Sequence, residues 1–289
     1  MPLNFELVAG PYESALGGVV WDGTAVLFSA VTQSRIFRFD PATGKAEEFR
    51  KQTGRTNGLR LGPQGELYGA QEGSRRVIEF MPDGSARITA VQLDGRYHNF
   101  PTDLAVDRAG RIWFSDPYNP VLAIGPQLFP YLDHASVLRL QRARNHQWFI
   151  TRMTHDTKAP RAVLLSADEK TLFVSEGVTA GLRELRAYPI GADDRLGEFT
   201  VLCRFGEDHR GPHRGLEGMC LDASGNIVAC GGWKKSGPGP FISVMSPDGL
   251  VLESHPFPED LPMRCAFGGG DRKTLYVTTG TGKLYRSKP

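Results

Sequence analysis

The sequence lacks the segments that would place the protein in a membrane or on a polyanion. It has no run of about 18 apolar residues, and its N-terminal MPLNFELVAG has neither the basic start nor the long apolar stretch of a secretion signal. Its 34 basic and 32 acidic residues leave a net charge of only +2, and the basic residues are scattered. We therefore expect a cytoplasmic protein that binds neither nucleic acid nor membrane; the pattern leaves its oligomeric state open.

Cysteine is scarce and the common catalytic motifs are missing. Four cysteines without CxxC spacing lie mostly in apolar, strand-like runs, which favours buried free thiols over a zinc site or a disulfide framework. GxSxG, HExxH and P-loop motifs do not occur, and the glycines at 268–270 belong to a β-turn rather than to a dinucleotide fingerprint. The usual hydrolase and nucleotide-hydrolysing classes therefore have no motif to support them.

A repeat of paired apolar strands organises the whole chain. Segments such as LRLGPQGELYGA, LAVDRAGRIWFSD and VLLSADEKTLFVSE each contain a strand, a turn and a strand, and copies begin near residues 20, 59, 104, 163, 219 and 265. A spacing of roughly 40 to 60 residues is typical of propeller blades. Because helical periodicity and linkers are missing, we predict one all-β domain over residues 1–289, a six-bladed β-propeller. The last unit is one strand short, and NFELVAG would complete it and close the ring.

Two insertions interrupt the repeat, at residues 117–136 and 231–240. Long loops with apolar residues of their own are often lids or binding loops, but they also serve to cover a blade. Both interpretations stay open for these two segments.

Polar residues stand where the inner strand of each predicted blade begins. In a propeller these positions meet at one end of the central channel, so they predict a pocket there. The residues that precede the six copies are Gly17, Asn57, Thr102 with Asp103, Arg161, Glu217 and Arg264.

Four segments carry a family resemblance that extends over nearly the whole chain. TNGLRLGPQGELYGAQEG, NFPTDLAVDRAGRIWFSDPYNP, GLEGMCLDASGNI and AFGGGDRKTLYVTTG resemble the gluconolactonase and senescence-marker-protein family, which includes luciferin-regenerating enzymes. The resemblance implies a six-bladed propeller that hydrolyses sugar lactones or related esters. It also implies a Ca, Zn or Mn ion in the central channel, held by a Glu, one or two Asn and an Asp.

At the positions of those ligands the sequence departs from the family. Gly17, Thr102, Arg161 and Glu217 stand there, so none keeps the expected residue type. Divalent cations need several oxygen ligands, and a guanidinium cannot coordinate a metal. We therefore predict no cofactor and no metal at the family position. A displaced ion held by Glu217, Asp103 and Asn99 is the alternative.

The substitutions make the predicted channel entrance basic. Guanidinium groups suit a carboxylate, phosphate or enolate oxygen, and their alternative role is to pair with Glu217 and Asp103 as structural ions. Asn57 is expected to orient substrate, or else to form the turn before Gly58. Asp103 is also expected to accept backbone N–H groups at its strand entrance. The predicted substrate-binding residues are Arg161, Arg264, Asn57, Thr102, Asn99 and Asp103.

Three residues are candidates for proton transfer. A carboxylate near two arginines should have a lowered pKa and act as a base, which favours Glu217. His213 and His98 are the other candidates, because histidine titrates nearer neutral pH and can return a proton; each can also be an ordinary loop residue.

Three functions remain open at this stage. The first is hydrolysis of a lactone or related cyclic ester, on an anionic small molecule and without metal, since a general base and arginines at the oxyanion can perform ester opening. The second is a metal-independent lyase or isomerase acting on a carboxylated small molecule. The third is a non-catalytic ligand-binding propeller. We expect the hydrolase.

Overall fold

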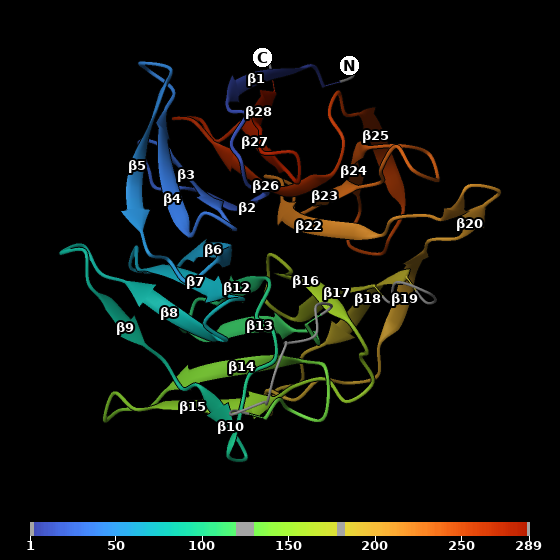
Figure 1. Ribbon diagram of the computed structural model, residues 1–289. Helices are drawn as coiled ribbons and strands as arrows, with labels where there is room; N and C mark the ends of the chain where they lie inside the picture. The colour runs from blue at the N-terminus through green and yellow to red at the C-terminus, as the bar shows by residue number, and fades with distance from the viewer. Residues whose placement is uncertain (1–2, 120–129, 178–182, 288–289) are drawn as a thin grey trace.

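Six four-stranded antiparallel sheets are arranged as blades around a central channel (Figure 1). The computed structural model describes residues 3–119, 130–177 and 183–287. The first three blades contain β2 (Leu16–Trp21), β3 (Val26–Ala30), β4 (Arg35–Asp40), β5 (Lys45–Lys51), β6 (Thr56–Leu61), β7 (Leu67–Gln71), β8 (Arg76–Phe80), β9 (Ala86–Ile88), β12 (Leu104–Val106), β13 (Ile112–Asp116), β14 (Ser136–Arg142) and β15 (Trp148–Arg152).

The last three blades continue the same order from the channel outward. They contain β16 (Pro160–Leu165), β17 (Thr171–Gly177), β18 (Arg183–Pro189), β19 (Thr200–Arg204), β22 (Leu216–Leu221), β23 (Ile227–Gly231), β24 (Phe241–Met245), β25 (Val251–Pro256), β26 (Pro262–Gly268), β27 (Thr274–Thr279), β28 (Leu284–Ser287) and β1 (Phe5–Ala9). Two hairpins, β10 (Gln92–Leu93) with β11 (Arg96–Tyr97) and β20 (Glu207–Asp208) with β21 (Gly211–Pro212), lie outside the blades. The predicted six-bladed propeller is confirmed, with the inner strands where the repeat placed them.

The turns of the repeat explain why these segments pair as strands. In blade 3 the Gly110 N–H donates to the Asp107 carbonyl at 2.9 Å, and the Asp107 carboxylate accepts the Arg111 N–H at 2.8 Å. Gly110 has a φ of 77°, a left-handed conformation that glycine adopts without a steric penalty. The turn therefore sets the register in which Leu104 faces Phe114.

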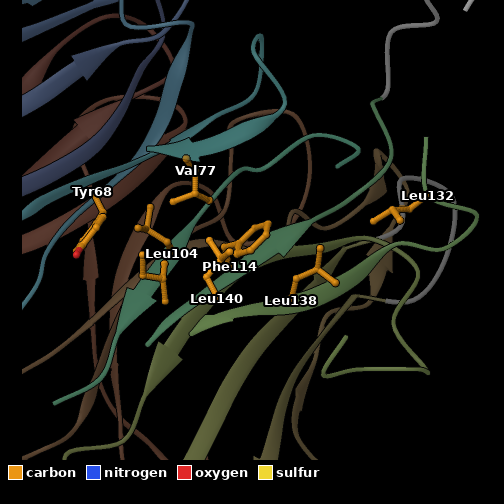
Figure 2. Close-up of a cluster of buried hydrophobic side chains, with 9 residues drawn as sticks. Tyr68, Val77, Leu104, Phe114, Leu132, Leu138 and Leu140 are labelled. Atoms are coloured by element: carbon orange, nitrogen blue, oxygen red, sulfur yellow. The ribbon is translucent and has the colours of Figure 1, made fainter. Parts of the chain in front are cut away.

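Apolar side chains from neighbouring blades share a core. Tyr68 and Val77 of blade 2 pack with Leu104, Phe114 and Leu138 of blade 3 (Figure 2). Each such side chain contributes roughly 1.5–3 kcal/mol when it is fully buried. The blades are thus held to one another by the same alternation that the sequence shows.

The ring closes through the N-terminal strand. β1 pairs antiparallel with β28 as the outermost strand of the last blade, with Phe5 opposite Ser287 and Leu7 opposite Tyr285. The Phe5 ring packs edge-on against Phe257 at 4.9 Å between centroids. The predicted closure by NFELVAG is confirmed.

We expect removal of residues 1–9 to lower the free energy of unfolding by about 3 kcal/mol or more, because Phe5 burial and several strand hydrogen bonds are lost. The bared β28 edge should also promote self-association. Urea denaturation and gel filtration measure the two effects. Leu7→Ala is the matched control in the same strand: Leu7 is 47% exposed, so its truncation should change stability little. Unaltered stability of the truncated chain would show that β1 does not hold the ring closed.

The four cysteines are free thiols, and Cys220, Cys230 and Cys265 are buried as predicted, whereas Cys203 is half-buried. No helix in residues 3–119, 130–177 and 183–287 is long and apolar enough to cross a membrane.

Arg60 crosses the central channel below the predicted pocket. From β6 its Nε donates to the Leu104 carbonyl of blade 3 at 3.0 Å, and its Nη2 donates to the Met219 carbonyl of blade 5 at 2.9 Å. A cavity of about 430 Å³, lined in part by Arg60, lies at the far end of the channel. Of the described residues, none lines both this cavity and the one at the entrance of the inner strands.

Candidate active site

A cavity of about 440 Å³ lies where the inner strands begin. Five of the residues predicted for the site line it: Asn57, Thr102, Arg161, Glu217 and Arg264. Loop residues and two strand residues, Gly177 of β17 and Met263 of β26, complete the wall; the loop residues are Phe100, Pro117, Tyr118, Asn119, Lys158 and Ala159. The 117–136 insertion thus reaches the cavity through residues 117–119, while its residues 120–129 lie outside the described structure.

Register shifts turn the site residues away from their sheets. Five of the six inner strands carry an irregularity near their start, at Leu16/Val19, Thr56/Gly58, Pro160/Ala162, Leu216/Gly218 and Pro262/Arg264. A bulge leaves one residue out of the ladder and re-aims its side chain. Asn57, Arg161 and Glu217 are the residues left out of three of these ladders, and Met263 and the two glycines 17–18 are left out of the other two.

The glycine after two of these bulges permits the close packing of inner strands. A Cβ on Gly218 would come within 2.4 Å of the Met263 carbonyl oxygen, and one on Gly58 within 2.8 Å of a Leu104 methyl. In the Asn-Gly and Glu-Gly pairs of the sequence, the first residue therefore lines the cavity. The glycine that follows it lets the inner strand of the next blade pack closely against the backbone.

Hydroxyl groups fix the bulged backbone from the preceding blade. Ser115 donates to the Arg161 carbonyl at 2.7 Å and Ser175 to the Leu216 carbonyl at 2.6 Å. Two further contacts repeat this arrangement around the ring, from Ser29 to the Asn57 carbonyl at 3.3 Å and from Thr278 to the Gly17 carbonyl at 2.7 Å. These hydroxyls come from the second strand of blades 1, 3, 4 and 6, so one repeated position supports four site segments.

Glu217 is buried between two guanidinium groups. Its Oε2 lies 3.3 Å from Arg161 Nη1 and its Oε1 lies 3.0 Å from Arg214 Nη2. Burial raises the pKa of this carboxyl, but Arg214, Arg161 and Arg264 together outweigh that effect and hold the pKa below its usual value. The carboxylate is therefore ionised at neutral pH.

Arg264 is buried against Asp103. Its Nε lies 3.5 Å from Asp103 Oδ1, and its guanidinium also donates to the Met263 carbonyl at 3.3 Å. The other oxygen of Asp103 accepts the Val163 N–H at 3.3 Å, a contact of the kind expected at a strand entrance. Arg161 thus pairs with Glu217 and Arg264 with Asp103, as expected if they are structural ion pairs. Both arginines also line the cavity.

The amide of Asn57 is oriented from behind. Its Nδ2 donates to Glu72 Oε2 at 2.8 Å, while Glu72 Oε1 accepts two bonds from Arg55 at 2.8 and 3.1 Å. Asn57 Oδ1 is buried and has no hydrogen-bond partner among the described residues. The Asn57 amide is therefore fixed through its Nδ2, and its Oδ1 accepts no hydrogen bond from the described residues.

His98 and Asn99 lie in the core of blade 3 instead of in the cavity wall. His98 is fully buried, its ring 5.1 Å from that of Phe114, with Nε2 3.0 Å from the Ala90 carbonyl oxygen. Burial lowers the pKa of His98 to about 4, so the ring is neutral. The Asn99 side chain donates to the His134 carbonyl at 2.8 Å, and its N–H donates to Asp116. This placement corrects the prediction that the two residues face a substrate.

His213 also lies outside the cavity lining. Its Nε2 is 3.6 Å from an Asp208 carboxylate oxygen, and its ring contacts the loop that contains Gly237. The 231–240 insertion is therefore packed beside His213, and its Ser236 is buried and donates to the Pro212 carbonyl at 2.5 Å. None of these contacts places His213 at the wall of the 440 Å³ cavity.

Three basic residues of the site were not predicted. Lys158 lines the cavity, Arg214 pairs with Glu217, and Arg183 reaches the same region from β18. None of them occupies a repeated position at the start of an inner strand. Of the three, only Arg214 could have been found from the sequence, because it stands three residues before Glu217 in RGLE.

The comparisons with known proteins agree with this architecture. The family model described as the SMP-30/Gluconolactonase/LRE-like region matches residues 17–281. The chain belongs to this family. Among solved structures, a gluconolactonase from Xanthomonas campestris has a TM-score of 0.80 at 23% identity over 99% of this chain and 89% of its own. A virginiamycin B lyase from Staphylococcus aureus has a TM-score of 0.58 at 14% identity over 97% and 83%, a likeness of fold alone.

Three curated relatives of the chain are named as lactonases. The gluconolactonase of Zymomonas mobilis is 25% identical, over 90% of this chain and 75% of the relative. The pentonolactonase XacC of Haloferax volcanii is 26% identical, over 92% and 81%. The 6-deoxy-6-sulfogluconolactonase of Pseudomonas putida is 24% identical, over 86% and 80%.

The residues at the family's metal position do not fit a divalent ion. A Cβ on Gly17 would already lie 2.5 Å from the Asn57 carbonyl oxygen, the Thr102 hydroxyl donates to the Phe100 carbonyl, and both oxygens of Glu217 face guanidinium groups. Within the described ranges, no group of three or more His, Cys, Asp or Glu residues could hold a metal. The alternative site is not assembled either, because Asn99 lies in the core and Asp103 pairs with Arg264.

Proposed function

We propose that this protein hydrolyses a lactone or related cyclic ester of an anionic small molecule, with Glu217 as the base and without the family's divalent metal. The observation that carries the proposal is the ionised, buried carboxylate of Glu217 in the wall of a 440 Å³ cavity that also contains Arg161 and Arg264. The lactonase names of the relatives support the reaction class.

The chemistry follows from the groups in the wall. Glu217 accepts a proton as water adds to the lactone carbonyl carbon, and the negative charge that develops on the carbonyl oxygen is stabilised by Arg264 and Arg161. The ring C–O bond then breaks, and the departing alkoxide takes the proton from Glu217, which gives a hydroxycarboxylic acid. The new carboxylic acid then releases its proton to solvent and becomes a hydroxycarboxylate. A carboxylate with a lowered pKa is a weak base. The arginines must therefore supply a large share of the rate, of the order of 10²–10³ for one oxyanion donor.

The charge of the wall favours an anionic substrate. Among the described residues that line the cavity, Lys158, Arg161 and Arg264 are positively charged and Glu217 carries the one carboxylate. Opposite charges in a secluded cavity attract a carboxylate, phosphate or sulfonate more strongly than a neutral sugar. The relative from Pseudomonas putida is named for a sulfonated lactone, which agrees with this preference.

Two neutral groups are suited to hold the ring. Asn57 Oδ1 can accept a hydrogen bond from a substrate hydroxyl, because Glu72 already fixes the amide. Thr102 donates to the Phe100 carbonyl at 2.8 Å, which leaves its oxygen as an acceptor at the cavity wall. Both groups position the substrate and take no part in the proton transfer or in the cleavage of the ring C–O bond.

We expect lactone hydrolysis to persist, within about twofold, after dialysis against EDTA, because the described residues assemble no set of oxygen ligands around Glu217. A panel of aldonolactones and carboxylated cyclic esters, followed by pH-stat, measures the rate. Lactones also open spontaneously, so Glu217→Gln supplies the background. Loss of activity on chelation with recovery in Ca²⁺, Zn²⁺ or Mn²⁺ would contradict metal independence. Conversion of a carboxylated substrate without uptake of water would establish the lyase or isomerase alternative instead.

A further inference from the structure

A cavity of about 280 Å³ lies between blades 4 and 5, apart from the candidate active site. Blade 4 lines it with Cys203 of its outer strand, blade 5 lines it with residues of β24 and β25, and the 231–240 insertion lines it with Pro238 and Pro240. None of the described residues lines both this cavity and the 440 Å³ cavity that contains Glu217. The insertion that interrupts the repeat thus forms part of a separate cavity wall.

Small side chains of blade 5 account for this space. In blade 3 the second and third strands fill the interface with the preceding blade, where Phe114 stands opposite Leu138. At the same position of the repeat, blade 5 has Ala229 opposite Ser243. Protein interiors rarely leave a void larger than a water molecule. The cavity is therefore a property of the blade 5 sequence and not of the propeller fold in general.

The Ser243 side chain places a hydroxyl group without a partner in the cavity wall. Ser243 is 5% exposed, and its Oγ is buried and makes no hydrogen bond with the described residues. Ser254 stands directly opposite on β25 and lines the same cavity. A buried polar group without a partner is destabilising, and a bound molecule with a hydrogen-bonding group recovers that free energy. The wall therefore offers a hydrogen bond to a ligand.

The rest of the wall is uncharged and mostly apolar. Of the described residues that line the cavity, none is Asp, Glu, Lys, Arg or His. Burial raises the pKa of the Cys203 thiol, so this group is neutral at neutral pH. Phe205, Phe241 and Met245 contribute two aromatic rings and a thioether. Such a wall gives an ordered water few polar partners, whereas an aromatic ring packs well against other rings and against sulfur.

The size and position of the cavity suit one small molecule that enters from solvent. Apolar cavities of about 150 Å³ accept a benzene ring, so 280 Å³ leaves room for a ring with a substituent. Pro238 and Val251 are exposed, whereas Leu216 and Ser243 are buried. All four line the cavity, which therefore extends from the surface into the interface between the two blades.

We propose that the cavity between blades 4 and 5 binds a neutral molecule with one aromatic ring and one hydroxyl group, which Ser243 holds by a hydrogen bond. This site is separate from the hydrolysis proposed for Glu217 and does not depend on it. The 231–240 insertion then acts as a binding loop, which is one of the two roles that the sequence left open.

Isothermal titration calorimetry with phenol and toluene tests the site, because the two molecules have nearly the same shape and only phenol has a hydroxyl group. Phenol should bind the parent protein at millimolar concentration, about fivefold or more tightly than toluene, and Ser243→Ala should bind both alike. Ser243→Leu introduces the side chain that blade 3 has at this position. It should weaken phenol binding by about tenfold or more and raise the thermal midpoint, since it fills the cavity. Ser224→Leu is the matched control, because Ser224 is exposed in the turn after β22 and its replacement should leave phenol binding unchanged.

The other outcomes overturn the proposal. Equal affinity of the parent protein for phenol and toluene would show that Ser243 holds no hydroxyl group. Phenol binding that persists in a folded Ser243→Leu variant would place the molecule elsewhere, and self-association that phenol reverses would assign the cavity to a second copy of the chain. Failure of the parent to bind phenol overturns the site even if the variants do not fold. Lactone hydrolysis enters none of these measurements, so the proposed function is tested independently.

Discussion

Glu217→Gln should reduce kcat by about 10²- to 10⁴-fold while KM changes much less, because the amide keeps the shape of the side chain and removes the base. Steady-state kinetics on the best lactone measure both constants. A thermal midpoint close to that of the parent protein must accompany the result, since both oxygens of Glu217 contact arginines. Full turnover in a folded variant would show that Glu217 only pairs with Arg161 and Arg214.

The pH dependence gives a second measure of the same group. The arginines hold the pKa of Glu217 below its usual value, so the carboxylate stays ionised as the pH falls through 6 and 5. Activity that depends on this base should therefore decline only below the normal glutamate range. The associated contribution to stability has the same sign: it is present at neutral pH and is lost on acidification through the lowered pKa. An acid limb near pH 6–7 would implicate another group as the base.

Arg264→Met should have the largest effect on stability, a loss of about 3–5 kcal/mol, because it leaves the buried carboxylate of Asp103 without its partner. The same change should raise KM for an anionic lactone by about tenfold or more, since a charge-assisted contact in the cavity is removed. Chemical denaturation and steady-state kinetics measure the two effects separately.

The double variant Asp103→Asn with Arg264→Met distinguishes the two roles of Arg264. It removes both charges, so much of the lost stability should return. If KM for the anionic lactone remains high, Arg264 binds substrate. Recovery of KM together with stability would make Arg264 a structural partner of Asp103, which is the alternative that the sequence left open.

The fold could be predicted from the sequence because one unit recurs. The turns that begin with residues such as Asp107 recur in the repeat, and the shortfall of one strand after Cys265 identified β1 as the closing strand. The positions of Asn57, Arg161 and Glu217 were predictable for the same reason, since the start of each inner strand is a repeated position. The hydroxyls that hold those starts, Ser115 among them, are part of the same pattern.

Interactions outside the repeat could not be predicted in this way. Arg183 belongs to a third strand, and its approach to Glu217 depends on how blades 4 and 5 face each other. His98 and Asn99 were predicted to belong to the site because polar residues before an apolar strand are typical of one. In the structure both side chains are buried in blade 3 and neither lines the cavity. The Asn99 N–H donates to the carboxylate of Asp116, which lies at the end of β13. The Asp116 side chain is fully buried, and burial raises its pKa to about 7.

Arg60 lies between the two cavities of the central channel, and none of the described residues lines both. Its guanidinium ties the inner strands of blades 2, 3 and 5 across the axis. In the proposed hydrolysis, substrate and product share the cavity at the entrance of the inner strands. A hydroxycarboxylate product carries one more negative charge than its lactone, so its departure past Lys158 and the arginines should be slow and accumulated product should compete with fresh substrate.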